Sequence, residues 1–281
     1  MTPLDLAELL RPAPTDEPGR FTLDVPDGLQ QGRGAWGGVA TGAMVSAAQQ
    51  VDPRPEMAVR TMSAQLVAPL LVGRANVGVE VLRQGSGTTT AAVRVTDAVG
   101  ALIAHGVVVL GFPRTGEAIP DGPEWLSQEP RAELAAGPDA VPVIPLGPPV
   151  APHFLRHLEI RPIGGLPFSG GGGADVTGWV RPLAPVSRLD APVVVALADA
   201  WWVAVIAKME RPRPVGTLGF TVDLPTDPAT VPCEADGRLR PLLHRGRTVA
   251  ARDGYTVERR ELWSEDGRLV SWNTQTVAVI K

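Results

Sequence analysis

Residues 191–208 have the sequence APVVVALADAWWVAVIAK, a stretch that is apolar on every side except for one acid, Asp199. The stretch is too long for a strand, and a helix satisfies its own backbone hydrogen bonds in an apolar setting. We therefore predict a single buried core helix over residues 191–208. An ionised carboxylate inside such a helix costs several kcal/mol unless hydrogen-bond donors surround it. The fold must supply those donors.

Two interpretations of Asp199 remain open from these residues alone. In the first, the carboxylate pairs with a nearby arginine or caps a neighbouring loop, because structural ion pairs also occur around buried acids. In the second, the carboxylate takes part in chemistry. The second interpretation requires further polar side chains that converge on Asp199 from other parts of the chain.

The composition is typical of a globular protein from a reducing compartment. The chain has 281 residues and a net charge of −4, with arginines that are scattered rather than clustered, which argues against a nucleic-acid partner. Its only cysteine, Cys233, excludes an internal disulfide and a cysteine-rich zinc site. The acidic N-terminus lacks the basic and apolar regions of a signal peptide. Because the long apolar run is short for a membrane span and contains an acid, we predict a cytoplasmic protein without a membrane segment.

Two parts of the chain repeat the same order of elements. Residues 61–69 (TMSAQLVAP) align with residues 217–225 (TLGFTVDLP), and residues 99–104 (VGALIA) align with residues 266–271 (DGRLVS). A period this long indicates two copies of one α+β unit rather than a solenoid of short repeats. A helix is expected at residues 38–51, with strands at 60–68, 75–83, 88–97 and 101–112; the second copy has strands at 216–224, 233–243, 248–264 (with a break near Gly254) and 269–280.

The repeat sets the expected domain organisation. The first unit is expected at residues 1–112, a Pro/Gly-rich linker with a short helix near 130–136 at residues 113–152, and the second unit at residues 153–281. The second unit opens with strands at 155–160 and 174–181, joined by a hairpin tip with four consecutive glycines. Each unit should wrap a sheet around its own helix, and the two sheets should pair edge to edge.

The sequence resembles the tandem, or double, hotdog acyl-CoA thioesterases of the bacterial type-II (TesB-like) kind. The resemblance covers nearly the whole chain apart from the N-terminal segment and the linker. It implies an α+β fold of two tandem hotdog units, an acyl-CoA or acyl carrier protein substrate, no cofactor, and a homo-oligomer. It rests on the segments 36–44 (WGGVATGAM), 79–89 (VEVLRQGSGTT), 178–182 (GWVRP), 197–202 (LADAWW) and 273–277 (NTQTV).

The resemblance also implies a water-binding site. Members of this family hold a water with an Asp on the second helix, a Thr or Ser on the next strand and a Gln on the last strand. The corresponding residues are Asp199, Thr217 and Gln275. Thr221 remains a rival for the hydroxyl, because the residues around Thr217 match the family pattern less well.

The internal repeat indicates one site per chain. Asp199 aligns with Ala43, and Gln275 aligns with Val108, so the first copy lacks the acid and the amide. Thr217 aligns with Thr61, which leaves open that this threonine only favours a strand.

Thioester hydrolysis needs a positioned water, a proton acceptor and donors for the oxyanion. Asp199 is the candidate acceptor, with Thr217 and Gln275 as donors to the carboxylate or the water. Backbone N–H groups at a helix N-terminus suit an oxyanion, and Gly38 opens the first helix without a side chain. We expect substrate contacts from four further residues: Trp36, Gly37, Trp202 and Arg83, with Arg83, like Arg181, a candidate for the phosphates of coenzyme A.

Two other functions remain open. An enoyl-thioester hydratase or dehydratase would use the same fold, but it usually pairs an acid with a histidine, and no histidine is near Asp199 in the sequence. A non-catalytic acyl-thioester or small-molecule binding protein is also compatible, since fold does not determine function. The four histidines show no metal-ligand spacing, so no metal is expected, and His153 and His157 are predicted to be a surface pair.

Overall fold

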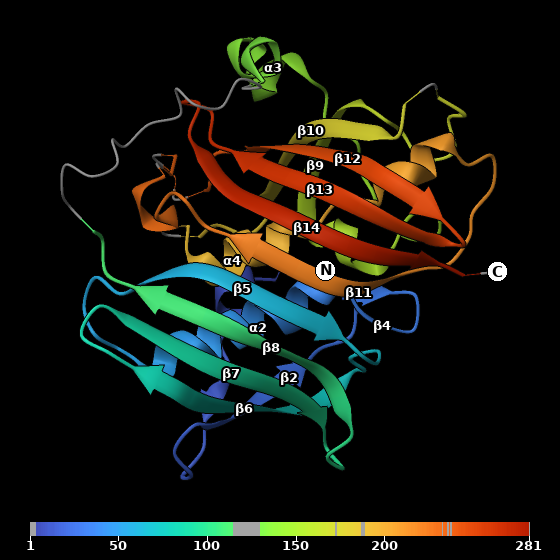
Figure 1. Ribbon diagram of the computed structural model, residues 1–281. Coiled ribbons are helices and arrows are strands. Elements are labelled where there is room, and N and C mark those ends of the chain that lie inside the picture. The colour runs from blue at the N-terminus through green and yellow to red at the C-terminus, as the bar shows by residue number, and fades with distance from the viewer. Residues whose placement is uncertain are drawn as a thin grey trace.

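The computed structural model describes residues 4–114, 130–171, 173–186, 189–231, 233–234, 236 and 238–280. Most of the strands in these residues belong to one large antiparallel sheet that curves around two helices (Figure 1). Part of the predicted linker, residues 115–129, lies outside the described part of the chain, as does one glycine of the predicted hairpin tip. The fold class predicted from the sequence, two hotdog units in tandem, is confirmed.

The first unit begins with short elements and continues with a long helix and four strands. Its elements are α1 (Leu6–Leu9), β1 (Ala13–Pro14), β2 (Arg20–Val25), β3 (Gln30–Gln31), β4 (Gly34–Ala35), α2 (Gly37–Val51), β5 (Ala58–Leu66), β6 (Gly73–Gln84), β7 (Thr88–Asp97) and β8 (Leu102–Gly111).

The second unit repeats this order after three short helices. The elements are α3 (Arg131–Ala136), the 3-10 helices η1 (Pro138–Ala140) and η2 (His153–His157), β9 (Leu158–Gly164), β10 (Asp175–Pro182), α4 (Ala191–Ala198), η3 (Ala204–Lys208), β11 (Val215–Asp223), η4 (Pro228–Thr230), β12 (Leu242–Arg252), β13 (Tyr255–Trp263) and β14 (Leu269–Val279).

The two units join edge to edge in a sheet of 12 strands. Its order is β1-β2-β6-β7-β8-β5-β11-β14-β13-β12-β10-β9, so the second half mirrors the first about the β5–β11 pair. That pair runs antiparallel from Gly219 opposite Gln65 to Asp223 opposite Thr61. Because each unit covers one edge of the other, neither presents that edge to solvent.

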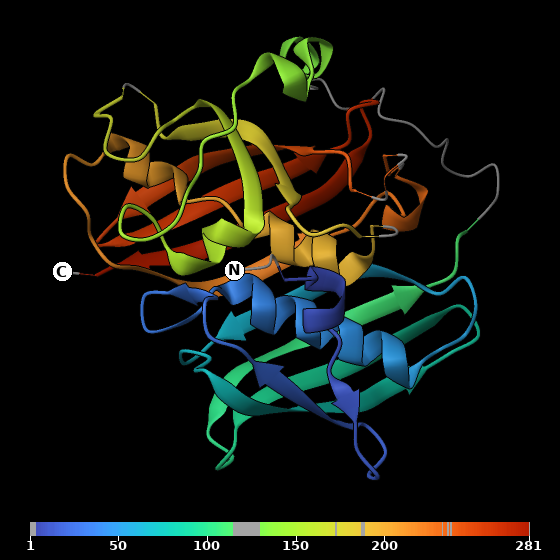
Figure 2. The same ribbon diagram turned by 180° about the vertical axis from the view of Figure 1, so that it is seen from behind.

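Helices α2 and α4 lie side by side against the same face of the sheet (Figure 2). They run antiparallel, because Gly42 of α2 lies against the first turn of α4, where a Cβ on Gly42 would be 3.0 Å from the Pro192 carbonyl oxygen. At the other end of the pair, Gly37 lies against Asp199. The amino end of α2 therefore meets the carboxyl end of α4.

The apolar run at residues 191–208 does not form one helix, and that prediction is wrong beyond Ala198. Helix α4 ends there, Asp199 is its C-cap with φ −102° and ψ 7°, and the chain turns before η3 starts at Ala204. Two buried side chains of β13 satisfy backbone groups that the break leaves free. Glu258 Oε2 accepts from the Ala204 N–H at 2.8 Å, and Arg260 Nη1 donates to the Ala198 carbonyl at 3.3 Å.

Other differences from the sequence predictions are local. The strand expected at 233–243 is wrong: among the described residues of this range before β12, Cys233 and Leu239 form only an isolated bridge, and β12 starts at Leu242. The break expected near Gly254 is confirmed, since it separates β12 from β13. His157 is buried rather than on the surface, with its Nδ1 3.4 Å from the Leu4 N–H. Within the described residues, no helix is long and apolar enough to cross a membrane.

Candidate active site

Asp199 lies where the ends of the two central helices meet, and only 6% of it is exposed. Its carboxylate rests against the first residue of α2: a Cβ on Gly37 would lie 2.7 Å from Asp199 Oδ2. The backbone N–H of Gly38 also acts on this carboxylate and lowers its pKa. The amino end of α2 carries the positive end of a helix dipole, whereas the carboxyl end of α4 carries the negative end of its own. Helix α2 therefore stabilises the charge that α4 disfavours.

The side chain of Gln275 links Asp199 to Thr217. Gln275 Nε2 donates to Asp199 Oδ1 at 3.0 Å and also lies 3.0 Å from Asn273 Oδ1. Thr217 Oγ1 donates to Gln275 Oε1 at 3.1 Å. With its oxygen engaged by the hydroxyl, the amide turns its N–H groups toward Asp199. Thr217 thus acts on Asp199 through Gln275 and does not bond to the carboxylate directly.

A β-bulge decides which threonine faces the site. In a regular strand Thr217 and Thr221 would point to the same face. However, the pairing of β11 with β14 shifts between Thr217, opposite Val277, and Gly219, opposite Thr276. The extra residue reverses the side-chain direction, so the Thr217 hydroxyl points to Gln275. Thr221 Oγ1 instead lies 3.2 Å from Ser63 Oγ at an exposed position. The structure therefore brings Thr217, and not its rival, to this cluster.

Sequence reasoning missed two charged residues beside Asp199. Arg260 Nη1 lies 3.6 Å from Asp199 Oδ1, and Arg260 Nε donates to Glu258 Oε1 at 2.9 Å. Both side chains are buried, on the inner face of β13. A signal was present in residues 256–262 (TVERREL), where charged residues occupy both faces of the strand, although a half-buried strand should alternate polar with apolar residues.

Burial raises the pKa of Asp199 above its ordinary value. Arg260, the Gln275 amide and the Gly38 N–H oppose this rise, while the nearby Glu258 adds to it. The raised pKa means that the carboxylate takes up a proton more readily than an exposed aspartate does.

One buried histidine lies in this region, but it is not bonded to Asp199. His244 stacks on Trp201 with ring centroids 5.1 Å apart, and neither of its ring nitrogens has a hydrogen-bond partner among the described residues. Burial lowers the pKa of His244 well below its ordinary value, and Arg260 lowers it further. The imidazole is therefore neutral near neutral pH.

Two of the predicted substrate-binding residues are tryptophans that pack in the interior near the site. Trp36 is the N-cap residue of α2 and stacks on Phe154 with ring centroids 4.8 Å apart. Trp202 is half-buried, donates from Nε1 to the Gly165 carbonyl at 2.8 Å and packs edge-on against Trp201. Both residues adjoin members of the cluster in the chain: Trp36 precedes Gly37, and Trp202 follows the break at Asp199.

Arg83 is not brought to the cluster. It is exposed near the turn between β6 and β7, and that turn is bound by Arg54, whose Nη1 donates to the Gly85 carbonyl at 2.9 Å. Arg54 follows the carboxyl end of α2, whereas Gly38 is at its amino end. The 15 residues of α2 separate these ends by about 20 Å.

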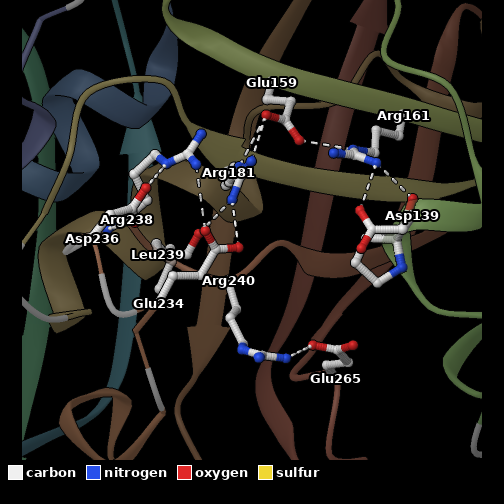
Figure 3. A network of polar contacts seen from close by, with 11 residues as sticks. Asp139, Glu159, Arg161, Arg181, Glu234, Asp236, Arg238, Leu239, Arg240 and Glu265 are labelled. Atoms are coloured by element: carbon white, nitrogen blue, oxygen red, sulfur yellow. Dashed lines mark hydrogen bonds and ion pairs between the residues drawn. The ribbon is translucent and has the colours of Figure 1, made fainter.

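Arg181 is held in an ion-pair network at the outer edge of the second unit (Figure 3). It lies 2.8 Å from Glu159 and 2.9 Å from Glu234, and Arg161 bridges the same Glu159 to Asp139 of η1. Arg181 and Glu159 are almost fully buried. This network ties β9 and β10 to the linker, so Arg181 does not face solvent as a phosphate-binding arginine would.

Asp199 is almost fully buried in this structure. A surface groove of about 730 Å³ is lined by residues of α1, β2 and the start of β6, and Asp199 is not among them. Two smaller hollows are likewise lined by residues other than Asp199. Among the described residues, no group of three or more His, Cys, Asp or Glu side chains is placed to hold a metal ion. Because only 6% of Asp199 is exposed, a substrate can reach its carboxylate only if neighbouring side chains move.

Comparisons with known proteins identify the two halves. Residues 25–111 match the family model described as the acyl-CoA thioesterase N-terminal domain, and residues 131–279 match the acyl-CoA thioesterase C-terminal domain. No curated protein matches the chain by sequence.

Solved structures share the fold over almost the whole chain. A hotdog-fold protein of unknown function from Alicyclobacillus acidocaldarius is 24% identical, with a TM-score of 0.80 and coverage of 98% of each chain. A putative thioesterase II from Thermobifida fusca YX is 19% identical, with a TM-score of 0.77, covering 98% of this chain and 97% of that one. An acyl-CoA thioesterase II, TesB2, from Mycobacterium marinum is 16% identical, with a TM-score of 0.68 and 98% coverage of each chain.

Proposed function

The chain belongs to the acyl-CoA thioesterase family, and on that premise we propose that it hydrolyses acyl-CoA thioesters to a free acid and coenzyme A. The observation that carries the proposal is the convergence on Asp199 of an oriented amide and the amino end of a second helix. Such an arrangement suits a water and an acyl group that react between the two units.

In this proposal Asp199 accepts a proton from the attacking water. A general base is most effective when its pKa is close to the working pH, and burial moves the pKa of Asp199 in that direction. Gln275 donates to the carboxylate and orients it, and Thr217 fixes the amide. A water that bridges Asp199 and Gln275 would be held on the side of the carboxylate that faces α2.

The first unit supplies the oxyanion site. As the thioester carbonyl becomes tetrahedral, its oxygen gains negative charge, which backbone N–H groups at a helix N-terminus stabilise. Gly38 is the candidate donor. In this structure its N–H acts on Asp199, and the Asp199 carboxylate fills the space beside Gly37, so the carboxylate would have to shift when a thioester carbonyl binds. The carbonyl would then lie between Gly38 and the water on Asp199, so each unit contributes one part of the reaction.

Replacement of the acid tests this proposal. Asp199→Asn should abolish release of coenzyme A from acetyl-, butyryl-, octanoyl- and palmitoyl-CoA, measured with a thiol reagent, while the thermal unfolding midpoint and circular dichroism stay close to wild type. Asp223→Asn, at the exposed end of β11, is the matched control and should retain full activity. Hydrolysis that persists in the Asp199→Asn protein would reject the assignment, and an acyl carrier protein thioester tests the other carrier.

A second candidate function is a non-catalytic acyl-thioester binding protein. The observation that favours it is the buried arginine beside the buried Asp199, because an ion pair can hold a carboxylate for structural reasons alone. Calorimetric binding of an acyl-CoA by the wild-type protein, without release of coenzyme A at any chain length, would support this function. The hydratase alternative receives no such support, since His244 is not bonded to Asp199.

A further inference from the structure

Three charged side chains lie together in the interior of the second unit. Arg260 stands between two carboxylates, 3.6 Å from Asp199 and 2.9 Å from Glu258. All three residues are at most 6% exposed, so water screens their charges weakly. With both acids ionised, the group carries one positive and two negative charges. The charge of Asp199 is therefore balanced by an arginine that is shared with a second acid.

The position of Arg260 is fixed by contacts other than the one to Asp199. Its Nε donates to Glu258, and its Nη1 donates to the Ala198 carbonyl at the end of α4. Glu258 is itself held by the Ala204 N–H. Because the guanidinium is planar, these bonds place it beside Asp199 with little freedom.

The contact between Arg260 and Asp199 is electrostatic rather than a hydrogen bond. At 3.6 Å the nitrogen is beyond hydrogen-bond range of Asp199 Oδ1, which instead accepts from Gln275. Arg260 can thus favour the ionised carboxylate without taking a hydrogen-bonding position on Oδ1.

The other groups that face this cluster are mostly neutral. Strand β14 contributes the amides of Gln275 and Asn273, and α2 contributes the backbone N–H of Gly38. Strand β12 contributes His244, whose pKa burial lowers first and Arg260 lowers further, so its ring is neutral. Glu258 and Arg260 are consequently the charged side chains, among the described residues, that set the charge state of Asp199.

We propose that Arg260, fixed in place by Glu258, is a positioning residue for Asp199 that keeps the carboxylate ionised inside the buried site. Glu258 limits this effect by drawing on the same guanidinium. The role in catalysis rests on the proposed thioester hydrolysis, whereas the electrostatic coupling of the three side chains does not.

The proposal predicts opposite effects for neighbouring substitutions. Loss of Arg260 removes a charge that favours ionised Asp199, so the pKa of Asp199 should rise. Loss of the Glu258 charge removes a repulsion and leaves Arg260 with Asp199 as its one charged partner among the described residues, while the Ala198 carbonyl still holds the guanidinium, so the pKa of Asp199 should fall. If ionised Asp199 is the base, the acid limb of the profile of kcat/KM against pH moves up in the first case and down in the second.

A merely structural role gives a different result. Arg260 and Glu258 also satisfy backbone groups at the break after α4, so their loss destabilises the protein. Loosening of the fold would lower kcat/KM by a similar factor at every pH and would leave the acid limb in place.

The experiment compares Arg260→Met, Arg260→Lys and Glu258→Gln with wild type in the full chain. Hydrolysis of octanoyl-CoA is followed from about pH 5 to pH 9. At a pH below the pKa of Asp199, a rise of one unit in that pKa lowers the ionised fraction, and with it kcat/KM, about tenfold. We expect such a rise in Arg260→Met, with recovery at high pH, partial restoration in Arg260→Lys, and a downward shift in Glu258→Gln. An acid limb that does not move in any variant overturns the proposal.

Arg259→Gln is the matched control. Arg259 is the next residue of β13, faces the other side of the sheet and lies over the Trp272 ring at 4.8 Å. Its replacement changes the net charge by the same amount as Arg260→Met, so it should leave the acid limb unchanged. A shift equal to that of Arg260→Met would mean that net charge alone is responsible and would overturn the assignment to Arg260.

A second readout does not depend on activity. Carbon-13 NMR of the labelled aspartate carboxyls, with the Asp199 signal assigned by its loss in Asp199→Asn, measures the pKa of this group directly. The pKa should rise in Arg260→Met and fall in Glu258→Gln. If wild type releases no coenzyme A, the proposed function fails while this titration still tests the coupling; an Asp199 pKa equal in all variants rejects the coupling itself.

Discussion

The carboxylate of Asp199 lies against the backbone of Gly37, the first residue of the opposite helix. This close approach places the acid at the positive end of α2, although Asp199 itself ends α4. Any side chain at position 37 would occupy the space of the carboxylate. The pair therefore explains in physical terms why glycine suits this position and why the two units are both needed for one site.

The first prediction concerns this contact. In Gly37→Ala the new methyl would lie 2.7 Å from Asp199 Oδ2 and 3.0 Å from Leu66 Cδ1, so the carboxylate must move. A displacement near 1 Å in an active site costs on the order of 100-fold in rate, and we expect a loss of kcat/KM of that size for acyl-CoA hydrolysis. Gly216→Ala is the control, since no atom lies within 4 Å of its Cβ position. Equal activity of the two variants would contradict the prediction.

The second prediction separates the two threonines of β11. Thr217→Val removes the donor that orients the Gln275 amide, and we expect kcat/KM to fall about tenfold, which corresponds to one hydrogen bond of roughly 1.4 kcal/mol. Thr217→Ser should retain most of the activity. Thr221→Val changes a hydroxyl that pairs with Ser63 on the other face and should behave as wild type. A larger loss in Thr221→Val than in Thr217→Val would reverse the assignment.

The third prediction concerns the carboxyl end of α2. The buried Asp52 is bonded by Arg54 at 2.7 Å and by the Thr89 hydroxyl, and these bonds, Arg54 first, hold its pKa well below the ordinary value. The group therefore stabilises the fold fully above the unfolded pKa of about 3.9, and this contribution is lost as the pH falls toward the folded value.

Replacement of Asp52 should show that dependence. Asp52→Asn is expected to lower the free energy of unfolding by about 2 kcal/mol at neutral pH, measured by urea denaturation, with a smaller difference below about pH 3. Asp24→Asn removes an exposed pair with Arg74 and should change the free energy of unfolding by less than about 1 kcal/mol. A difference between wild type and Asp52→Asn that grows as the pH falls would contradict the prediction.

The fourth prediction tests the network at the outer edge of the sheet. Arg181→Met leaves the buried Glu159 with Arg161 alone, and we expect a loss of about 3 kcal/mol in the free energy of unfolding. Arg240→Met removes a half-exposed pair with Glu265 and should cost less than about 1 kcal/mol. Acyl-CoA hydrolysis should be unchanged in both. A selective rise in KM for Arg181→Met, without loss of stability, would instead indicate contact with the substrate.

The sequence predicted those parts of the fold that follow a hydrophobic period or the internal repeat. Periodicity predicted the four main strands of the first unit closely; β7, for example, has the bounds Thr88–Asp97 that were expected. In the second unit it placed a strand at residues 233–243, whereas β12 starts only at Leu242. The alignment of residues 61–69 with 217–225 identified β5 and β11, the two strands that join the units. These features are local or periodic, so they can be read without knowledge of distant contacts.

The site was only partly predictable, because its key features depend on tertiary contacts. Hydrophobicity could not show that α4 stops at Ala198, since the break is stabilised by Glu258 and Arg260 from a distant strand. Nor could alternation show that Thr217 faces Gln275, because the bulge at Leu218 reverses the strand face there. Arg83 was predicted to bind substrate from its charge and its neighbours in sequence. Neither shows that Arg83 lies near the carboxyl end of α2, far from Gly38 at the amino end.

Helix α2 runs unbroken for 15 residues, whereas its counterpart α4 stops after 8. In a homodimer of hotdog subunits, every substitution appears in both helices. A break in one helix would then occur in the other as well, and the acid at the break would lack an intact partner helix. Covalent fusion of two copies removes that constraint. Each copy can then change alone, and one half of the molecule can keep a rigid scaffold while the other half gives up helical structure for chemistry.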